Sequence, residues 1–230
     1  MQELRPRLKA AAAMVPPGSV VADIGTDHAY LPAFLLLSGV CPRVIACDVG
    51  EKPLRNAAET VKIYHLEEKI DLRISDGLQK VRPEEYDAVT VCGMGGTLIA
   101  EILAKALLPR DVRLVLQPMT HAEDVRAWLC RNGFVIGQEV CVRDAGRVYC
   151  CLCAERTASP VPAEPGYYYF GTLTGATEEE RAFLKKTRDR VRTRADALAA
   201  ADRFPEEQAM LRQALDYYER NYQNDRKRRL

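Results

Sequence analysis

Residues 20–30 read Val20-Val21-Ala22-Asp23-Ile24-Gly25-Thr26-Asp27-His28-Ala29-Tyr30. Their apolar run, which ends in small and polar residues, predicts a buried β-strand followed by a tight turn. A second run of the same kind, Ala88-Val89-Thr90-Val91-Cys92, leads into Gly93-Met94-Gly95-Gly96. Ligands of open α/β sheets bind at the carboxyl ends of the strands, in the crevice where the strand order reverses. The two turns therefore predict a cleft for a nucleotide-like cofactor.

Strand-like and helix-like segments alternate on both sides of these runs, as in a parallel sheet covered by helices. We expect strands at 20–25, 44–48, 70–75, 88–92 and 112–116, and helices at 3–14, 31–37, 52–64, 96–107 and 122–131. A hairpin formed by residues 135–142 and 147–153 is expected to close the sheet. The predicted fold is α/β, with a Rossmann-like sheet of seven strands that is mostly parallel and has one antiparallel strand.

The sheet domain is expected to end near residue 157, because residues 157–166 read Thr-Ala-Ser-Pro-Val-Pro-Ala-Glu-Pro-Gly. A segment this rich in proline and small residues continues neither a strand nor a helix. We assign residues 1–157 to a cofactor-binding domain, 158–176 to a linker and 177–230 to a helical hairpin.

The C-terminal segment has the pattern of two helices. Thr177 is a good N-cap, with Glu180 three residues later, and the helical pattern is interrupted near Pro205. The apolar positions of the first helix recur every seven residues, and those of the second step by four, three and four: Leu184, Val191 and Leu198, then Leu211, Leu215, Tyr218 and Tyr222. This spacing predicts an antiparallel coiled-coil hairpin.

Positive charge is concentrated in this hairpin. The whole chain carries a net charge of +1, but from Ala176 onward Lys and Arg outnumber Asp and Glu by 14 to 11. Basic runs such as residues 185–194 and 226–229 can hold RNA phosphates, and Lys186, Arg190 and Arg194 are our candidates. The alternative is a hairpin that serves as a dimer contact or as a lid on the core.

The composition, with 47% hydrophobic and 28% charged residues among 230, fits one large globular domain with a small appendage. The eight cysteines do not form two Cys-x-x-Cys pairs, so we expect reduced core residues of a cytoplasmic protein. A metal site at residues 150–153 is disfavoured because adjacent strand residues point to opposite faces. The basic residues 5–9 and a short Ala run soon meet Pro16, which argues against a signal peptide or a membrane span.

The first turn argues against a dinucleotide cofactor. A dinucleotide fold needs Gly-x-Gly-x-x-Gly, but Asp27 stands at the second glycine position and no third glycine follows. S-adenosylmethionine has no phosphates, so its site needs a tight turn and carboxylates at the strand ends. Asp48 is placed to accept the ribose hydroxyls, and Asp76 is placed to accept the adenine amine. Either could instead be a helix N-cap or a turn residue, but their occurrence at the ends of consecutive strands favours a site.

We therefore expect the cofactor to be held by Asp23, Gly25, Asp48, Asp76, Gly77, Gly93, Met94 and Gly95. Glycines would let the backbone lie close to the cofactor, since side chains there would fill the cleft. The alternative for Gly95 and Gly96 is that they begin a helix.

Three motifs resemble those of the bacterial tRNA (adenine-22-N1) methyltransferases: Asp23-Ile24-Gly25-Thr26-Asp27-His28-Ala29-Tyr30-Leu31-Pro32, Gly93-Met94-Gly95-Gly96 and Leu116-Gln117-Pro118. The resemblance spans nearly the whole chain. It implies a class I, Rossmann-like methyltransferase fold with a C-terminal coiled-coil domain, S-adenosylmethionine as donor and tRNA as substrate. The chain has Met119 where the family pattern has Asn, so an amide contact to the target base from that position is replaced here.

The chemistry assigns roles to the first motif. Adenine N1 is already a fair nucleophile, so methyl transfer mostly needs positioning in a pocket that excludes water. Asp27 is our candidate to accept from the exocyclic amine and to stabilise the developing positive charge, and Tyr30 is our candidate to stack on the base. Asp27 could instead be a turn residue that caps the next helix, and Tyr30 could be an aromatic residue packed in the first turn of that helix.

The remaining expected substrate contacts are His28, Gln117 and Pro118, although a structural role suits His28 well. Two other readings stay open. One is a methyltransferase of the same fold that acts on a small molecule or a protein, and the other is a binding module that has lost its chemistry.

Overall fold

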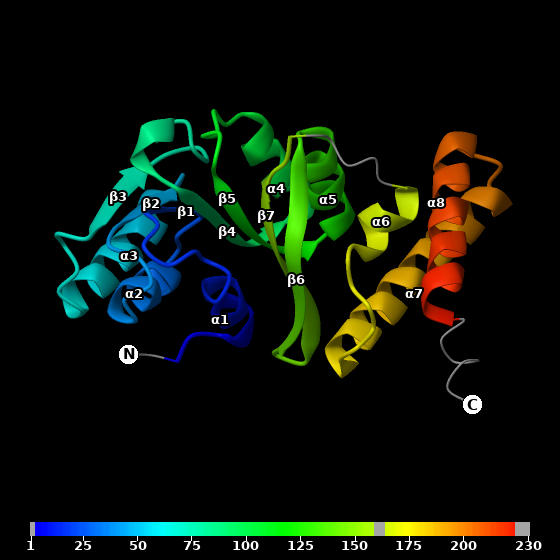
Figure 1. Cartoon of the computed structure of the whole chain (residues 1–230), viewed down its shortest axis with the longest axis horizontal. Coiled ribbons are helices and arrows are strands. Elements are labelled where there is room, and N and C mark those ends of the chain that lie inside the picture. The colour runs from blue at the N-terminus through cyan, green and yellow to red at the C-terminus, as the bar shows by residue number, and fades with distance from the viewer. Residues whose placement is uncertain (1–2, 159–163, 224–230) are drawn as a thin grey trace.

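The computed structural model describes residues 3–158 and 164–223, and a seven-stranded sheet forms its centre (Figure 1). The strand order is β3-β2-β1-β4-β5-β7-β6. The strands are β1 (Val21–Ile24), β2 (Val44–Asp48), β3 (Ile70–Ile74), β4 (Ala88–Gly95), β5 (Arg113–Thr120), β6 (Phe134–Asp144) and β7 (Arg147–Arg156). Strands β1 to β5 pair in parallel, and β7 is antiparallel to both β5 and β6. The predicted fold class is confirmed.

Helices cover both faces of the sheet. One face carries α1 (Pro6–Ala12), α2 (Tyr30–Leu37) and α3 (Glu51–Ile63), and the other carries α4 (Gly96–Ala104) and α5 (Ala122–Arg131), with a short turn η1 (Pro83–Glu85) before β4. Because successive strand residues point to opposite faces, Val21 joins the core under α1 and α2 while Ala22 joins the core under α4 and α5. The sheet is therefore buried on both sides, as its apolar strands predict.

Strand β4 extends three residues beyond the predicted end at Cys92, through the segment predicted to be a turn. Met94 pairs with Pro118 and Gly95 with Thr120, and register shifts separate these pairs from Cys92. Gly93, with φ of +85°, supplies the backbone conformation that such a bulge needs. Gly95 is the N-cap of α4, so the alternative role proposed for Gly95 and Gly96 is also present.

The C-terminal segment forms α6 (Pro165–Phe170), α7 (Glu178–Ala200), α8 (Pro205–Tyr218) and a π-helical turn, η2 (Glu219–Gln223), at the end of the molecule away from β3 (Figure 1). The N-cap predicted at Thr177 is present, since its hydroxyl accepts from the Glu180 N–H at 3.1 Å. The supercoiled geometry predicted from the heptad spacing stays a prediction. The basic residues 226–229 lie outside the described part of the chain.

Helices α7 and α8 form an antiparallel hairpin. Arg194 near the end of α7 pairs with Glu207 near the start of α8, while Arg188 lies over the Tyr218 ring at 5.4 Å. Helix α6, inside the segment assigned to a linker, packs Phe170 into the core of the hairpin. Pattern alone missed α6 because six residues carry too few turns to show a periodicity.

A buried ion pair joins α6 to the sheet domain. Arg126 of α5 and Glu139 of β6 have fully buried side chains, with Nε and Oε1 2.7 Å apart. Arg126 also donates to the carbonyl groups of Tyr168 and Tyr169, and Glu139 accepts the Thr172 N–H at 2.6 Å. We call these five residues the seam.

The described residues also bear on three expectations from composition. No helix within 3–158 and 164–223 has the length and apolar character needed to cross a membrane. Nor do these ranges contain three His, Cys, Asp or Glu side chains grouped so as to hold a metal. The eight cysteines are free thiols, seven of them buried, and burial raises the pKa of Cys41 to about 11 and those of Cys47 and Cys151 to about 12.

Candidate active site

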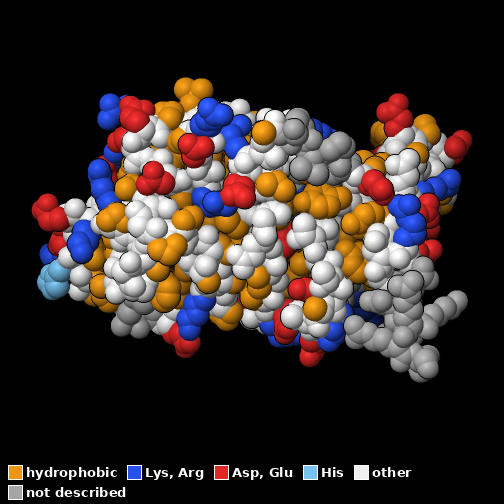
Figure 2. All heavy atoms as spheres, viewed as in Figure 1, with side chains coloured by type: hydrophobic (Ala, Val, Ile, Leu, Met, Phe, Trp, Pro, Cys, Tyr) orange, Lys and Arg blue, Asp and Glu red, His pale blue; other side chains and the backbone are white. Residues whose placement is uncertain are grey.

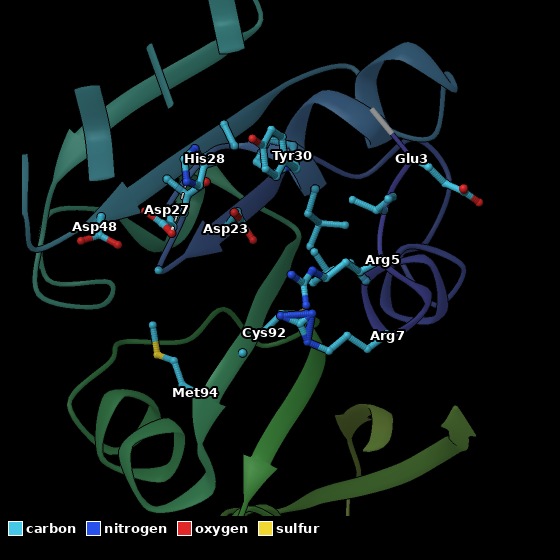
Figure 3. A pocket seen from close by; sticks show the side chains of 18 residues that line it. Glu3, Arg5, Arg7, Asp23, Asp27, His28, Tyr30, Asp48, Cys92 and Met94 are labelled. Carbon is cyan, nitrogen blue, oxygen red and sulfur yellow. Dashed lines mark ion pairs between the residues drawn. The ribbon is translucent and has the colours of Figure 1, made fainter. Parts of the chain in front are cut away.

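A cavity of about 650 Å³ opens at the carboxyl ends of β1 and β4, where the strand order reverses (Figure 3). Its walls come from three parts of the chain that are distant in sequence. They are the loop after β1, the end of β4, and residues 3–8 at the start of α1, with Asp48 at one end. The cleft predicted from the two turns is present at the predicted place.

Gly25 and Met94 meet across the cavity. Gly25 has φ of +80°, a conformation that side chains disfavour, and it lets the chain turn sharply after β1. A Cβ added at Gly25 would overlap the methyl group of Met94. A side chain at Gly25 would therefore strain the backbone of the turn and displace the flexible end of Met94.

Asp23 is the buried carboxylate of the cavity. Its exposure is 5%, and its Oδ1 accepts the Thr90 hydroxyl at 2.6 Å from the neighbouring strand. Burial raises the pKa of Asp23, and the Thr90 hydrogen bond opposes that rise. A desolvated carboxylate of this kind favours a cationic group beside it.

Asp48 ends β2 at the rim of the cavity. Its Oδ1 accepts the N–H of Gly50 at 2.8 Å, which holds the side chain in a defined rotamer just before α3. Its second oxygen has no hydrogen bond to any residue within 3–158 or 164–223. That oxygen can accept from a hydroxyl group, as predicted for a ribose.

Asp27, His28 and Tyr30 form the exposed side of the cavity. The His28 and Tyr30 rings are stacked, with centroids 5.0 Å apart and planes inclined by 4°. His28 Nε2 lies 3.6 Å from the Asp27 carboxylate, whose side chain is 67% exposed. The motif thus places an accessible carboxylate beside an aromatic platform.

Several predicted site residues do not line the cavity. Asp76 accepts from Gln79 at 3.1 Å and lies 3.8 Å from Lys105 Nζ, and Gly77 faces Ile102. Gln117, with Pro118 after it, is fully buried, and its amide nitrogen donates to the Pro118 carbonyl at 3.1 Å. Gly95 also lies outside the lining. The roles predicted for these residues remain predictions.

The three basic candidates on the hairpin differ in their surroundings. Arg190 makes two hydrogen bonds to Glu123 of α5, at 2.6 and 2.8 Å, and Arg194 pairs with Glu207 at 2.9 Å. Lys186 is exposed and has no such partner among the residues that the structure describes. On the face drawn in Figure 2, positive and negative side chains are mixed over the hairpin end.

Sequence reasoning missed the contribution of the N-terminal segment. Arg5 and Arg7 line the cavity, and Figure 3 shows their side chains pointing from the start of α1 toward Cys92. The basic run at residues 5–9 is visible in the sequence, but the local pattern bears only on whether this segment resembles a signal peptide. The position of these two arginines depends on how α1 packs against β4 to β7, which the local sequence pattern cannot predict.

Comparison with known proteins gives a consistent result. Residues 4–152 match the methyltransferase domain family. The chain is 37% identical over 189 residues to the tRNA (adenine(22)-N(1))-methyltransferase of Bacillus subtilis strain 168, an alignment that covers 80% of this chain and 79% of that relative. The crystal structure of the B. subtilis m1A22 tRNA methyltransferase TrmK is similar with a TM-score of 0.82 at 30% identity, over 95% of this chain and 97% of the other.

A Streptococcus pneumoniae protein, Sp1610, solved in complex with S-adenosyl-L-methionine, has a TM-score of 0.76 at 30% identity, over 93% of this chain and 100% of the other. The likeness therefore includes the helical C-terminal segment as well as the sheet. The motif that builds the cavity and the agreement over most of the chain lead to one conclusion, that the protein belongs to the tRNA (adenine(22)-N(1))-methyltransferase family.

Proposed function

We propose that the protein is an S-adenosylmethionine-dependent enzyme that transfers a methyl group to N1 of adenine 22 in tRNA. The observation that carries this proposal is the cavity between β1 and β4, built by the same residues, 23–32, that resemble the family. The likeness to the tRNA m1A22 methyltransferase of B. subtilis, 37% identical in the sequence comparison and with a TM-score of 0.82 in the structural one, supports it. The proposal includes the cytoplasm as the place of action, since tRNA is modified there.

The residues around the cavity fit the cofactor. Asp48 offers a carboxylate oxygen at the end of β2 for the ribose hydroxyls, and Gly25 leaves the passage beside Met94 open. The cavity volume of about 650 Å³ lies within the range of ordinary small-molecule sites. When bound, S-adenosylmethionine supplies an electrophilic methyl group on its sulfonium. Asp76 and Gly77 are proposed to contact the adenine ring of the cofactor.

The exposed side of the cavity suits the target base. The paired rings of His28 and Tyr30 offer a flat surface on which an adenine can stack. Methylation at N1 leaves a cationic ring whose exocyclic amine becomes acidic. The exposure of the Asp27 carboxylate beside these rings supports its proposed role, which is to accept from that amine and then to take its proton. Gln117 and Pro118 are proposed to support the opposite wall from inside the sheet.

An adenine inside folded RNA must leave its stack before its N1 can reach the cavity, which costs a few kcal/mol. We infer that the helical hairpin offsets this cost by holding backbone phosphates. The basic side chains best suited to this are Lys185, Lys186 and Arg212, which are exposed and have no carboxylate partner in the described ranges. Arg190 and Arg194 would have to exchange Glu123 and Glu207 for a phosphate.

The test is a methylation assay with labelled S-adenosylmethionine and unmodified tRNA, followed by digestion and identification of the labelled nucleoside. We expect label in 1-methyladenosine, and none when adenine 22 is replaced by guanine. The Asp27→Asn variant keeps the size of the side chain and removes its negative charge. It should lower the rate by about 10²-fold or more while leaving cofactor affinity nearly unchanged.

Label that persists in the tRNA lacking adenine 22 would contradict the position of methylation. A protein that binds the cofactor yet labels no RNA would instead point to a small-molecule or protein substrate. An Asp27→Asn variant as active as the wild type would leave the reaction standing and remove Asp27 from it.

A further inference from the structure

The paired ends of β4 and β5 contain two irregular positions. Strand β4 has one extra residue, Gly93, and strand β5 has one extra residue, Met119. The two register shifts offset each other, so pairing resumes at Gly95 and Thr120. Bulges next to active sites often re-aim a side chain. The irregularity in β5 therefore draws attention to the side chain of Met119.

A buried amide group holds this methionine. Gln117 has 0% exposure, and its Nε2 donates to the Pro118 carbonyl at 3.1 Å and to the Met119 sulfur at 3.6 Å. The Gln117 Oε1 is also buried and has no hydrogen-bond partner within residues 3–158 and 164–223. An unsatisfied buried carbonyl destabilises a fold. Gln117 therefore lowers stability through one atom while it fixes the end of β5 through the other.

Met119 lies on the side of the sheet that carries the cavity. Gln117 follows Val115 by two residues, and Val115 belongs to the core beneath α1, so the two side chains share that face. The contact with Gln117 places the Met119 sulfur on the same face. Cys92, which pairs with Gln117, packs on that core and lines the cavity. The partly exposed Met119 thus continues the cavity wall from β4 to β5.

A thioether held in one position suits the face of an aromatic ring. Sulfur is polarizable, and contacts between methionine and aromatic rings are favourable. A methionine side chain is usually flexible, but the Gln117 amide restricts Met119 before a ligand arrives, which reduces the entropy lost on binding. A thioether donates no hydrogen bond and accepts only weakly. Met119 can therefore recognise the flat shape of a ring, whereas its polar edge must be recognised by other groups.

The position of Met119 favours the target base over the cofactor as its ligand. In the strand order β2-β1-β4-β5, Asp48 ends β2 and Met119 lies near the end of β5. Neighbouring strands are about 4.8 Å apart, so three steps separate the two residues by roughly 14 Å. With the ribose of the cofactor at Asp48, the ring that receives the methyl group approaches from the β5 side.

We propose that Met119, held by Gln117, packs against the face of the target adenine at the β5 side of the cavity. The assignment rests on the proposed function and deepens it by naming a contact to the methylated base. Gln117 is then a positioning residue that acts through the Met119 sulfur.

The first experiment measures steady-state methyl transfer to unmodified tRNA. Met119→Ala should lower kcat/KM for tRNA by about 3- to 10-fold, because the contact between sulfur and ring is lost. Met119→Leu keeps a similar apolar volume, so its kcat/KM should stay within about threefold of the wild type. The affinity of both variants for S-adenosylhomocysteine, measured by isothermal titration calorimetry, should stay within about twofold of the wild type.

The second experiment tests the positioning role of Gln117. Gln117→Met keeps the length of the side chain and removes the amide, so one hydrogen bond is lost together with the unsatisfied carbonyl. The midpoint of urea denaturation should change little, while kcat/KM for tRNA should fall by about 3- to 10-fold. In the Met119→Ala background, Gln117→Met should cause no further loss, because its effect passes through the sulfur.

The matched control is Thr120→Ala. Thr120 is the exposed residue after Met119, and its hydroxyl group lies beside Gly95. Its kcat/KM for tRNA should stay within about twofold of the wild type. A loss equal to that of Met119→Ala would show that any change at the end of β5 impairs the reaction, and it would overturn the specific role of Met119.

Other outcomes would also overturn the proposal. Unchanged kcat/KM in Met119→Ala, or equal losses in the Ala and Leu variants, would remove the base contact. Weaker S-adenosylhomocysteine binding in Met119→Ala would assign the side chain to the cofactor. A further loss in the double variant would show that Gln117 does not act through Met119. A wild-type protein that labels no tRNA would overturn the proposed function itself, whereas an active wild type with an equally active Met119→Ala would overturn the contact alone.

Discussion

The cavity and the seam both contain arginines and carboxylates, but they use them in opposite ways. In the seam, Arg126 and Glu139 are fully buried, and they make further hydrogen bonds to the Tyr168 and Tyr169 carbonyl groups and to the N–H and hydroxyl of Thr172. In the cavity, Arg5 has no partner among the described residues and Asp27 is 67% exposed.

The difference separates charges that stabilise the fold from charges that are kept for a ligand. The donors and acceptors of a buried, hydrogen-bonded ion pair are already used and cannot bind a substrate. Removing one member of the pair leaves the other charge buried without a counter-charge. An unsaturated group costs stability, yet it can bind when an anion or a cation arrives. Hydrogen-bond saturation thus distinguishes the two regions better than charge does.

The largest effect is expected in the seam. Arg126→Met should lower the free energy of unfolding by about 3–5 kcal/mol, because Glu139 would remain buried without its counter-charge. Urea denaturation followed by circular dichroism measures the change. The matched control is Arg194→Met, whose pair with Glu207 is half exposed and should contribute far less than the buried pair. Equal losses in the two variants would remove the distinction between seam and surface.

In the cavity the expected effect is on binding and not on folding. Asp48→Asn should weaken S-adenosylhomocysteine binding by about 10- to 100-fold, because the amide NH2 group that replaces the free carboxylate oxygen cannot accept from a ribose hydroxyl. The amide oxygen can still accept the Gly50 N–H, so the unfolding free energy should change by less than about 0.5 kcal/mol. Calorimetric titration and urea denaturation measure the two quantities.

Asp76→Asn, measured alongside, sharpens this prediction. A loss of affinity like that of Asp48→Asn would support the predicted contact of Asp76 with the adenine ring. Unchanged affinity would limit Asp76 to its interactions with Gln79 and Lys105.

The smallest effect concerns the pair between Glu123 of α5 and Arg190 of α7. Burial would raise the pKa of Glu123, but hydrogen bonding to Arg190 outweighs it and lowers that pKa below its ordinary value of 4.5. A carboxyl group with a lowered folded pKa adds stability above its ordinary value and loses it as the pH falls below 4.5. Glu123→Gln should therefore show a weaker fall in unfolding free energy between pH 7 and pH 3.5, by roughly 1 kcal/mol or less. Identical pH profiles for variant and wild type would contradict the pair.

Much of this fold could be predicted because the information is local. Each apolar run of the parallel sheet is followed by its turn residues, and a strand order that reverses between β1 and β4 places the cleft at Gly25 and Gly93. Strand β4 was predicted too short because its bulged end depends on pairing with β5, which the sequence of β4 does not contain.

The missed parts of the site depend on long-range packing. Arg7 reaches Asp144, which is 137 residues away, only when α1 lies across the sheet. The basic run on α7 offers three candidate phosphate contacts, but Glu123, 67 residues before Arg190, pairs with Arg190, and Glu207 pairs with Arg194. A charge pattern shows which residues are basic and leaves open which carboxylates will reach them.

The seam also limits how the protein can be divided or recombined. A chain cut after Pro165 would keep Arg126 and Glu139 but lose the backbone groups of residues 168–172 that complete their hydrogen bonding. A hairpin transplanted to another sheet without α6 would lose Phe170, the centre of its own core. A unit that could be exchanged between proteins therefore begins before α6 and depends on Arg126 of α5 and Glu139 of β6. Grafting the hairpin onto a different methyltransferase would require that protein to have the same arginine and glutamate.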